Sequence, residues 1–222
     1  MKQRIRAVGF DFDGTLIISE EEKALQMAEV FREKFRIRKG VESAYKKLNG
    51  KALSREEKVK ALFQQFLKRN PAAGELRSIK SHFGRHYEKS LCTCPLFACT
   101  NIIKELKDQV DLVFLLSLED RKEVLDLTKK CGLAKYFDEI LGGPKTKIEN
   151  LRHLLHKYRL KPAQVMYIGD AHSDVIASRA VNVKAVLVGK KHLYEKLKED
   201  LEADFRFSSL CEIPYDIYGL KR

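Results

Sequence analysis

The chain lacks the features of a secreted or membrane-spanning protein. It has no tryptophan, only five prolines and only five cysteines among 222 residues. Its apolar runs reach about five to seven residues, far short of the roughly 20 that a helix needs to cross a bilayer. The first residues lead directly into an apolar run and show no signal-peptide pattern. We therefore expect a cytoplasmic protein that makes no membrane contact.

The cysteines show no framework of regular spacing. Their odd number fits free thiols in a reducing compartment better than a set of disulfides. Cys92, Cys94 and Cys99 lie close together, but no persuasive fourth zinc ligand accompanies them. The sequence leaves their role open.

Acidic residues are too few to balance the basic ones. The chain has 43 Lys and Arg against 31 Asp and Glu, a formal net charge of +12. Residues 17–92 hold 18 basic and 10 acidic residues, a net charge of +8. Such charge usually marks a solvated surface. It is also compatible with a surface that attracts anions, either small ones or a polynucleotide.

Residues 17–92 show helical periodicity and no convincing strand. Ser19 followed by Glu22 has the spacing of a capping box, and apolar residues recur at helical intervals after it. The pattern predicts an all-helical insert. Further helices within it are expected at residues 42–48, 55–68 and 75–89.

The rest of the chain alternates between strand and helix patterns. Such alternation predicts parallel βαβ units and a doubly wound parallel sheet, an α/β fold. The predicted domains are a core of residues 1–16 and 93–222 and the helical insert 17–92. Strands are expected at 4–10, 110–117, 137–141, 164–170 and 183–189, and helices at 100–107, 121–131, 147–158 and 174–180.

Polar residues suited to chemistry follow the predicted strands. Asp11 and Asp13 follow the first strand, Ser117 ends the second, and Asp170 ends the fourth, with Asp174 four residues later. The carboxyl ends of parallel strands meet at one edge of the sheet, where such folds bind ligands. Crowded carboxylates are costly unless a cation neutralises them. We therefore expect a divalent metal ion, Mg²⁺, among these acids.

These motifs resemble those of the haloacid dehalogenase-like hydrolase superfamily. D-x-D-G-T at 11–15, Ser117, a lysine and G-D-x-x-x-D at 169–174 occur in the family's order. The chain looks most like the phosphoglycolate phosphatase and β-phosphoglucomutase branch, over residues 1–16 and about 93–210. The resemblance implies a Rossmann-like core with an inserted helical cap. It also implies a Mg²⁺-dependent phosphatase acting on a small phosphomonoester, phosphoglycolate-like or sugar-phosphate-like.

The resemblance assigns a role to each motif residue. Asp11 would be the nucleophile that forms an aspartyl-phosphate. Asp13 would protonate the leaving alcohol and then deprotonate the hydrolytic water. Asp13 would also offer its backbone carbonyl to the metal, and Asp174 would orient metal-bound waters or the lysine. Phosphate binding is implied for Thr15, Ser117 and the lysine, and metal binding for Asp11, Asp13, Asp170 and Asp174.

The stretch GGPKTKIENL contains two candidate lysines. Relatives in which the lysine precedes x-E-x-L favour Lys147, and those with a K-P dipeptide favour Lys145. Either lysine would stabilise charge on the transferring phosphoryl group.

Two other functions remain open from the sequence. One is a phosphomutase of the β-phosphoglucomutase type. The other is a nucleic-acid-binding or nucleic-acid-end-processing protein that uses the basic helical insert. Nucleic acid is the less expected partner, because the phenylalanines of the insert fall at apolar helical positions, where they pack instead of stacking on bases. The sequence specifies neither the physiological substrate nor the oligomeric state.

Overall fold

The computed structural model describes residues 4–48, 53–91, 96, 100–189 and 203–218, except for the side chains of residues 20 and 84–91. The chain divides into two compact units. One unit is Met1–Ile18 with Pro95–Arg222, and the other is Ser19–Cys94.

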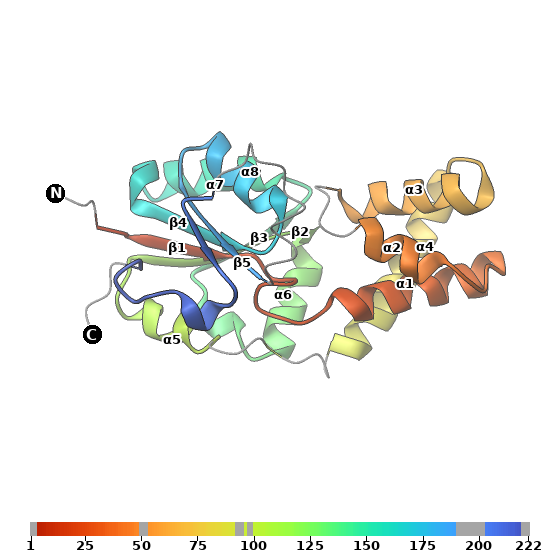
Figure 1. Cartoon of the computed structure of the whole chain (residues 1–222), viewed down its shortest axis with the longest axis horizontal. Helices are drawn as coiled ribbons and strands as arrows, with labels where there is room; N and C mark the ends of the chain where they lie inside the picture. Colours follow the sequence, from red (N-terminus) through yellow and green to blue (C-terminus); the bar gives the residue numbers. More distant parts are fainter. Residues whose placement is uncertain (1–3, 49–52, 92–95, 97–99, 190–202, 219–222) are drawn as a thin grey trace. The chain divides into compact units, whose positions relative to one another are not determined.

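The first unit is built on a parallel sheet, which confirms the predicted α/β fold class (Figure 1). Its six strands lie in the order β3-β2-β1-β4-β5-β6, and every neighbouring pair is parallel. The sequence did not reveal β6, which has only three residues and none fully buried. The strands are β1 (Ala7–Phe10), β2 (Leu112–Asp120), β3 (Glu139–Gly143), β4 (Val165–Gly169), β5 (Lys184–Val188) and β6 (Phe205–Phe207).

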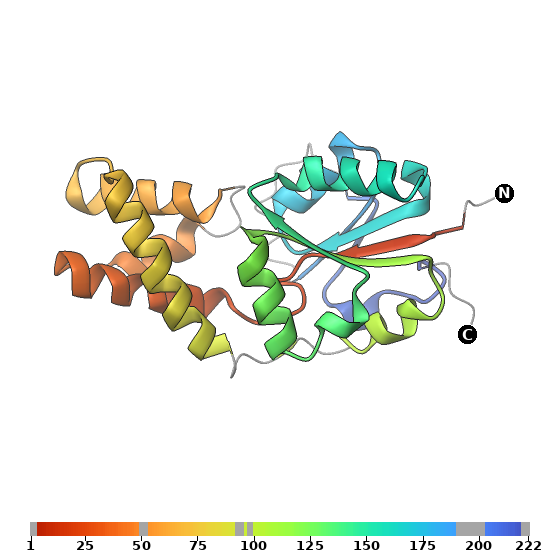
Figure 2. The ribbon, with the colours of Figure 1, turned by 180° about the vertical axis from the view of Figure 1, so that it is seen from behind.

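Helices cover both faces of this sheet, as its apolar central strands require. The helices α7 (Lys147–Lys157) and α8 (His172–Ala180) lie on one face, and α5 (Ile102–Lys107) and α6 (Arg121–Lys130) lie on the other (Figures 1 and 2). All of β1 and β4 is buried. The strand ends are therefore held by core packing on both sides, which fixes the residues that follow them.

Helices are the only regular secondary structure in the described residues of the second unit. Its helices are α1 (Glu20–Phe35), α2 (Val41–Leu48), α3 (Arg55–Leu67) and α4 (Ala73–Leu91). Phe31, Phe35 and Phe63 pack against one another, with ring centroids 5.0 to 5.6 Å apart. These phenylalanines therefore form a core, as their helical spacing predicted.

The predicted capping box at the start of α1 is wrong. Ser19 is the N-cap, but its backbone is in the right-handed helical region (φ −118°, ψ −9°) and its side chain makes no capping hydrogen bond. An N-cap serine normally needs an extended backbone to aim its oxygen at the free N–H groups. Glu22 instead accepts a hydrogen bond from Gln26. Capping boxes occur at Ser54–Glu57 and Thr146–Glu149.

The expectation of free cysteines is correct for Cys131 and wrong for Cys211, which is disulfide-bonded. Cys92, Cys94 and Cys99 lie outside the described residues. Among the residues that the structure describes, no helix is both long and apolar enough to cross a membrane.

Candidate active site

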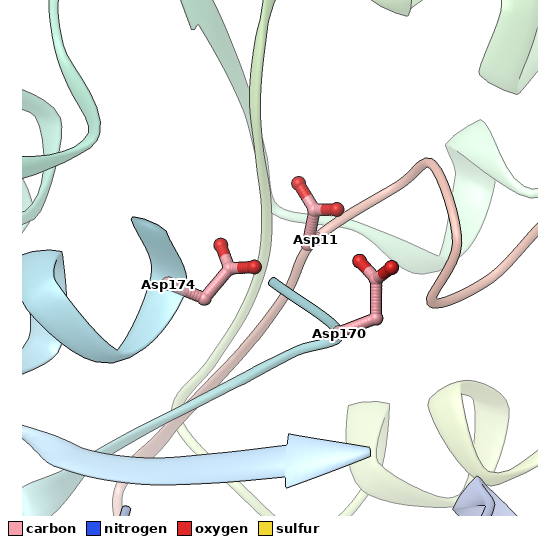
Figure 3. A group of neighbouring side chains, drawn as sticks. All are labelled: Asp11, Asp170 and Asp174. Atoms are coloured by element: carbon pink, nitrogen blue, oxygen red, sulfur yellow. The ribbon is translucent and has the colours of Figure 1, made fainter. Parts of the chain in front are cut away.

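Three acids from separate segments converge beyond the carboxyl edge of the sheet (Figure 3). Asp11 follows β1, Asp170 follows β4, and Asp174 lies in the first turn of α8. One ligand atom from each lies within 4.8 Å of the others. Asp11 and Asp174 are 6% and 1% exposed. These three side chains thus lie together at the carboxyl ends of the strands, where ligand sites form in parallel sheets.

The turn after β1 holds its shape through backbone hydrogen bonds. The N–H of Asp11 donates to the carbonyl of Ile168 at 2.8 Å, so the pairing of β1 with β4 continues to the acid itself. The N–H of Leu16 then donates to the carbonyl of Phe12 at 2.9 Å. Gly14 has a φ of +81°, and a Cβ there would lie 2.2 Å from Oδ2 of Asp170. Glycine at this position leaves room for the Asp170 carboxylate.

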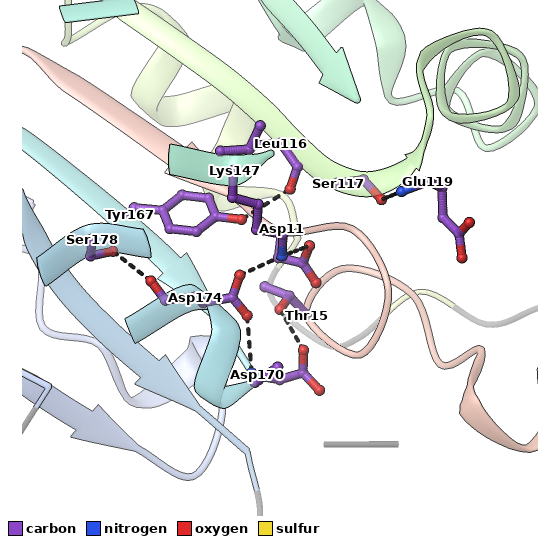
Figure 4. Close-up of polar contacts among 11 residues, drawn as sticks. Asp11, Thr15, Leu116, Ser117, Glu119, Lys147, Tyr167, Asp170, Asp174 and Ser178 are labelled. Carbon is purple, nitrogen blue, oxygen red and sulfur yellow. Dashed lines mark hydrogen bonds and ion pairs between the residues drawn. The ribbon is translucent and has the colours of Figure 1, made fainter. Parts of the chain in front are cut away.

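The structure brings Lys147, and not Lys145, to the acids (Figure 4). The Nζ of Lys147 lies 2.7 Å from Oδ1 of Asp11 and 2.5 Å from Oδ1 of Asp174, and its side chain is only 5% exposed. Lys145 is exposed. The capping box of Thr146 and Glu149 starts α7 at Lys147. The residue that the helix start directs inward is therefore Lys147.

Asp174 is engaged on both of its oxygens. Its Oδ1 meets Lys147, and its Oδ2 accepts a hydrogen bond from the N–H of Ala171 at 3.0 Å. A Cβ on Gly169 would lie 2.2 Å from Cγ of Asp174, so a side chain at that position would displace the carboxylate. These contacts hold Asp174 as a fixed anionic partner for Lys147.

The electrostatics of the cluster show a shortage of positive charge. Burial raises the pKa of Asp11 from 3.8 to about 7, and the charges of Asp174 and Asp13 add to this, although Lys147 opposes it. Burial by itself would lower the pKa of Lys147, but Asp11 and Asp174 outweigh it and raise that pKa above its ordinary value. Lys147 therefore remains an ammonium ion. One ammonium cannot balance the surrounding carboxylates.

This donor set fits a hard divalent cation. Ions such as Mg²⁺ are bound by carboxylate and carbonyl oxygens, and such oxygens are what the cluster of Asp11, Asp170 and Asp174 offers. Burial, and after it the charges of Asp174 and Asp13, keeps the pKa of Asp11 high, and a cation beside the carboxylate would oppose these effects. The residues of the site can thus hold a metal ion of this class.

The other predicted site residues lie around the cluster. The hydroxyl of Thr15 donates to Oδ1 of Asp170 at 3.4 Å. Ser117 is buried, and its Oγ accepts a hydrogen bond from the N–H of Glu119 at 3.1 Å. Asp13 is half-buried in the turn and stands outside the group of three acids, yet its charge contributes to the raised pKa of Asp11.

Two polar residues near Lys147 have no motif that could have revealed them. The side-chain amide of Asn150 donates to the carbonyls of Gly142 and Lys145 at 3.3 and 3.4 Å, which fixes the loop before α7. The hydroxyl of Tyr167 donates to the carbonyl of Leu116 at 2.9 Å. Burial, followed by the charges of Asp174 and Asp11, raises the pKa of Tyr167 well above its ordinary value, so the hydroxyl keeps its proton. The only sequence signal for Tyr167 is a polar atom within an apolar strand.

Known proteins share this fold and sequence pattern. The chain is 23% identical over 230 residues to a phosphoglycolate phosphatase from Mannheimia succiniciproducens, an alignment that covers 96% of this chain and 98% of that protein. A predicted phosphoglycolate phosphatase from Haemophilus somnus superposes with a TM-score of 0.78 at 19% identity, over 94% of this chain and 96% of that one. The HAD hydrolase YfnB from Bacillus subtilis, bound to magnesium, gives a TM-score of 0.74 at 17% identity, over 98% and 100% of the two chains.

The sequence also matches a family model over most of its length. The model is described as haloacid dehalogenase-like hydrolase, and it matches residues 8–188. That range includes all the acids of the cluster and Lys147, together with the helical unit between them in sequence. The chain therefore belongs to the haloacid dehalogenase-like hydrolases.

Proposed function

We propose that the chain is a Mg²⁺-dependent phosphatase that hydrolyses a small phosphomonoester through an aspartyl-phosphate on Asp11. The observation that carries the proposal is the buried ammonium of Lys147 between Asp11 and Asp174, beside a third acid from the end of β4. A nucleophilic carboxylate needs cations around it, because the phosphoryl group that it attacks is itself an anion.

In the first half-reaction, an oxygen of Asp11 attacks phosphorus and the bond to the ester oxygen breaks. Asp13 gives its proton to the departing alkoxide, which leaves as an alcohol. Lys147 neutralises charge on the phosphoryl oxygens, while Asp174 keeps its ammonium in place. The hydroxyls of Thr15 and Ser117 are the proposed donors to phosphate.

In the second half-reaction, Asp13 takes a proton from a water molecule, which attacks phosphorus and frees Asp11. Asp11, Asp170 and the backbone carbonyl of Asp13 are the proposed metal ligands, with Asp174 beside them. When bound, Mg²⁺ would supply positive charge for the carboxylates and the phosphoryl oxygens.

The helical unit Ser19–Cys94 is the proposed cap domain, corresponding to the expected insert 17–92. Its excess of basic residues includes Arg32, Arg36 and Arg38, which line a hollow of about 590 Å³ on this unit. The positive electrostatic potential of these basic residues would raise the local concentration of anionic esters. Phosphoglycolate is the first substrate to test, because a relative over nearly the whole length carries that activity in its name. A cytoplasmic location is part of the proposal.

The test is a screen of phosphomonoesters, including 2-phosphoglycolate and sugar phosphates, for release of inorganic phosphate with and without Mg²⁺. We expect Mg²⁺-dependent release that Asp11→Asn abolishes without loss of folding. Full activity after exhaustive chelation, or near-normal turnover by Asp11→Asn, would refute the mechanism. Incubation with a sugar monophosphate, followed by analysis for a rearranged sugar phosphate, separates a phosphatase from a phosphomutase. No specific observation on the described residues favours the phosphomutase or the nucleic-acid alternative.

A further inference from the structure

The ammonium of Lys147 has an aromatic neighbour in addition to its two carboxylates. Its Nζ lies 5.8 Å from the centroid of the Tyr167 ring. A cation within about 6 Å of an aromatic face is attracted by the ring quadrupole, more strongly where water is excluded. Both residues are buried, at 5% and 1% exposure. The Tyr167 ring is therefore a third neighbour of the Lys147 ammonium, in addition to the carboxylates of Asp11 and Asp174.

The Tyr167 ring is itself fixed from two directions. Its hydroxyl donates to the carbonyl of Leu116 on β2, and its ring stacks on Phe114 of the same strand, with centroids 6.2 Å apart and planes 6° apart. Tyr167 lies on β4, and β1 runs between β4 and β2. The side chain thus reaches over a whole strand and links β4, which Asp170 follows, to β2, which contains Ser117 (Figure 4).

A glycine makes this reach possible. Gly9 of β1 is in register with both Phe114 and Tyr167. A Cβ on Gly9 would lie 2.1 Å from the Phe114 ring. Backbones two strands apart are separated by roughly 9 to 10 Å, so the rings can meet only because the intervening residue has no side chain. The stacked rings of Phe114 and Tyr167 thus meet across Gly9, and Lys147 lies over the Tyr167 ring.

We infer that Tyr167 is a positioning residue, which holds the Lys147 ammonium between Asp11 and Asp174. The carboxylates attract the ammonium but do not define its place, because a lysine side chain has four rotatable bonds and could reach either partner alone. A ring backed by Phe114 and anchored on Leu116 closes the remaining side. The inference deepens the proposed function, and its kinetic arm rests on that function.

The kinetic arm is a double-mutant cycle with p-nitrophenyl phosphate. Tyr167→Phe removes only the hydroxyl, and Tyr167→Leu also removes the ring. We expect kcat to fall about five- to tenfold in Tyr167→Phe, the size of one lost net hydrogen bond, and further in Tyr167→Leu. In a Lys147→Ala background the same changes should cost less than about twofold, because residues that act through one another are not additive. Equal losses in both backgrounds would overturn the inference.

The second arm does not use activity. Hydrogen exchange of the Lys147 ammonium is measured by NMR on ¹⁵N-lysine-labelled, metal-free protein, with the signal assigned by its loss in Lys147→Ala. We expect faster exchange in Tyr167→Leu. Tyr158→Phe is the control, since Tyr158 donates to Glu139 at 2.7 Å and is the C-cap of α7, at the opposite end of the helix from Lys147. An unchanged exchange rate in Tyr167→Leu would overturn the inference. If the wild type hydrolyses no ester, the proposed function fails, and this arm still decides the role of Tyr167.

Discussion

Gly14→Ala should distinguish an effect on the proposed metal site from an effect on general stability. The substitution has two effects. It places an alanine at a φ of +81°, in the left-handed backbone region, which costs a non-glycine residue about 1–2 kcal/mol. It also puts that Cβ 2.2 Å from Oδ2 and 2.6 Å from Cγ of Asp170, so the carboxylate must rotate away. The first effect lowers the free energy of unfolding, and the second should lower metal affinity.

Gly132→Ala is the matched control. Gly132 has a φ of +69°, and nothing lies within 4 Å of its added Cβ. It therefore carries the backbone strain without the collision. We expect urea denaturation to show a loss of about 1–2 kcal/mol for both variants. Calorimetric titration with Mg²⁺ should show a loss of about ten- to a hundredfold in affinity for Gly14→Ala alone, because only this variant displaces the Asp170 carboxylate. That loss corresponds to about 1.4 to 2.8 kcal/mol of binding free energy. Wild-type Mg²⁺ affinity in Gly14→Ala would refute the assignment of Asp170 as a ligand.

Three further predictions follow from the same site. Lys147→Ala should lower kcat/KM by several orders of magnitude and Lys145→Ala by less than about twofold, and the reverse pattern in phosphate-release assays would show that the lysine is misassigned. The metal-free protein should lose stability as the pH rises from about 4 to about 7, because folding raises the pKa of Asp11 from 3.8 to about 7 and the folded state holds the extra proton in that range. Asp11→Asn should remove most of this loss of stability. Identical pH dependence of thermal melting in the wild type and in Asp11→Asn would contradict the prediction. The catalytic efficiency for a small ester should fall only modestly between about 50 and 200 mM salt, whereas the affinity for a polynucleotide would fall on the order of a thousandfold. Submicromolar nucleic-acid binding at physiological salt, with no ester turnover, would overturn the small-substrate proposal.

The predictable part of the site is the part that topology alone determines. Asp11 and Asp170 could be placed together because they follow strands of a parallel sheet, whose carboxyl ends share one edge. A near-continuous apolar run identified β2, since residues 112–117 of this strand are all buried. Neither inference required knowledge of any side-chain contact.

The choice between the lysines depended on where α7 begins. Thr146 and Glu149 have capping-box spacing, which makes Lys147 the first helical residue and leaves Lys145 in the exposed loop. The same spacing at Ser19 and Glu22 was misleading, because the backbone of Ser19 is not extended. Local spacing is compatible with a cap, but the conformation of the chain entering the helix decides whether it forms.

Tyr167 and Asn150 could not be identified from the sequence for a different reason. Their partners are backbone carbonyls of other segments, Leu116 for Tyr167 and Gly142 and Lys145 for Asn150. Every residue has a backbone carbonyl, so a hydrogen bond to a carbonyl requires no particular amino acid at the partner position. A sequence motif therefore cannot indicate such a bond. Such supporting contacts become visible only when strand register and helix placement are known.

The buried acids give the site a reason to take up a cation. Raising the pKa of Asp11 from 3.8 to about 7 corresponds to about 4 kcal/mol of unfavourable ionisation, even with Lys147 in contact. A cation that restores ordinary ionisation to Asp11 would recover free energy of that order, so electrostatic destabilisation of the metal-free fold becomes affinity for the metal. A neutral side chain at position 11 would remove the destabilisation, and it would also remove one proposed metal ligand and the proposed nucleophile. In the proposed mechanism this burial also has a benefit, because the environment that raises the pKa of Asp11 keeps competing water away from the carboxylate proposed to attack phosphorus.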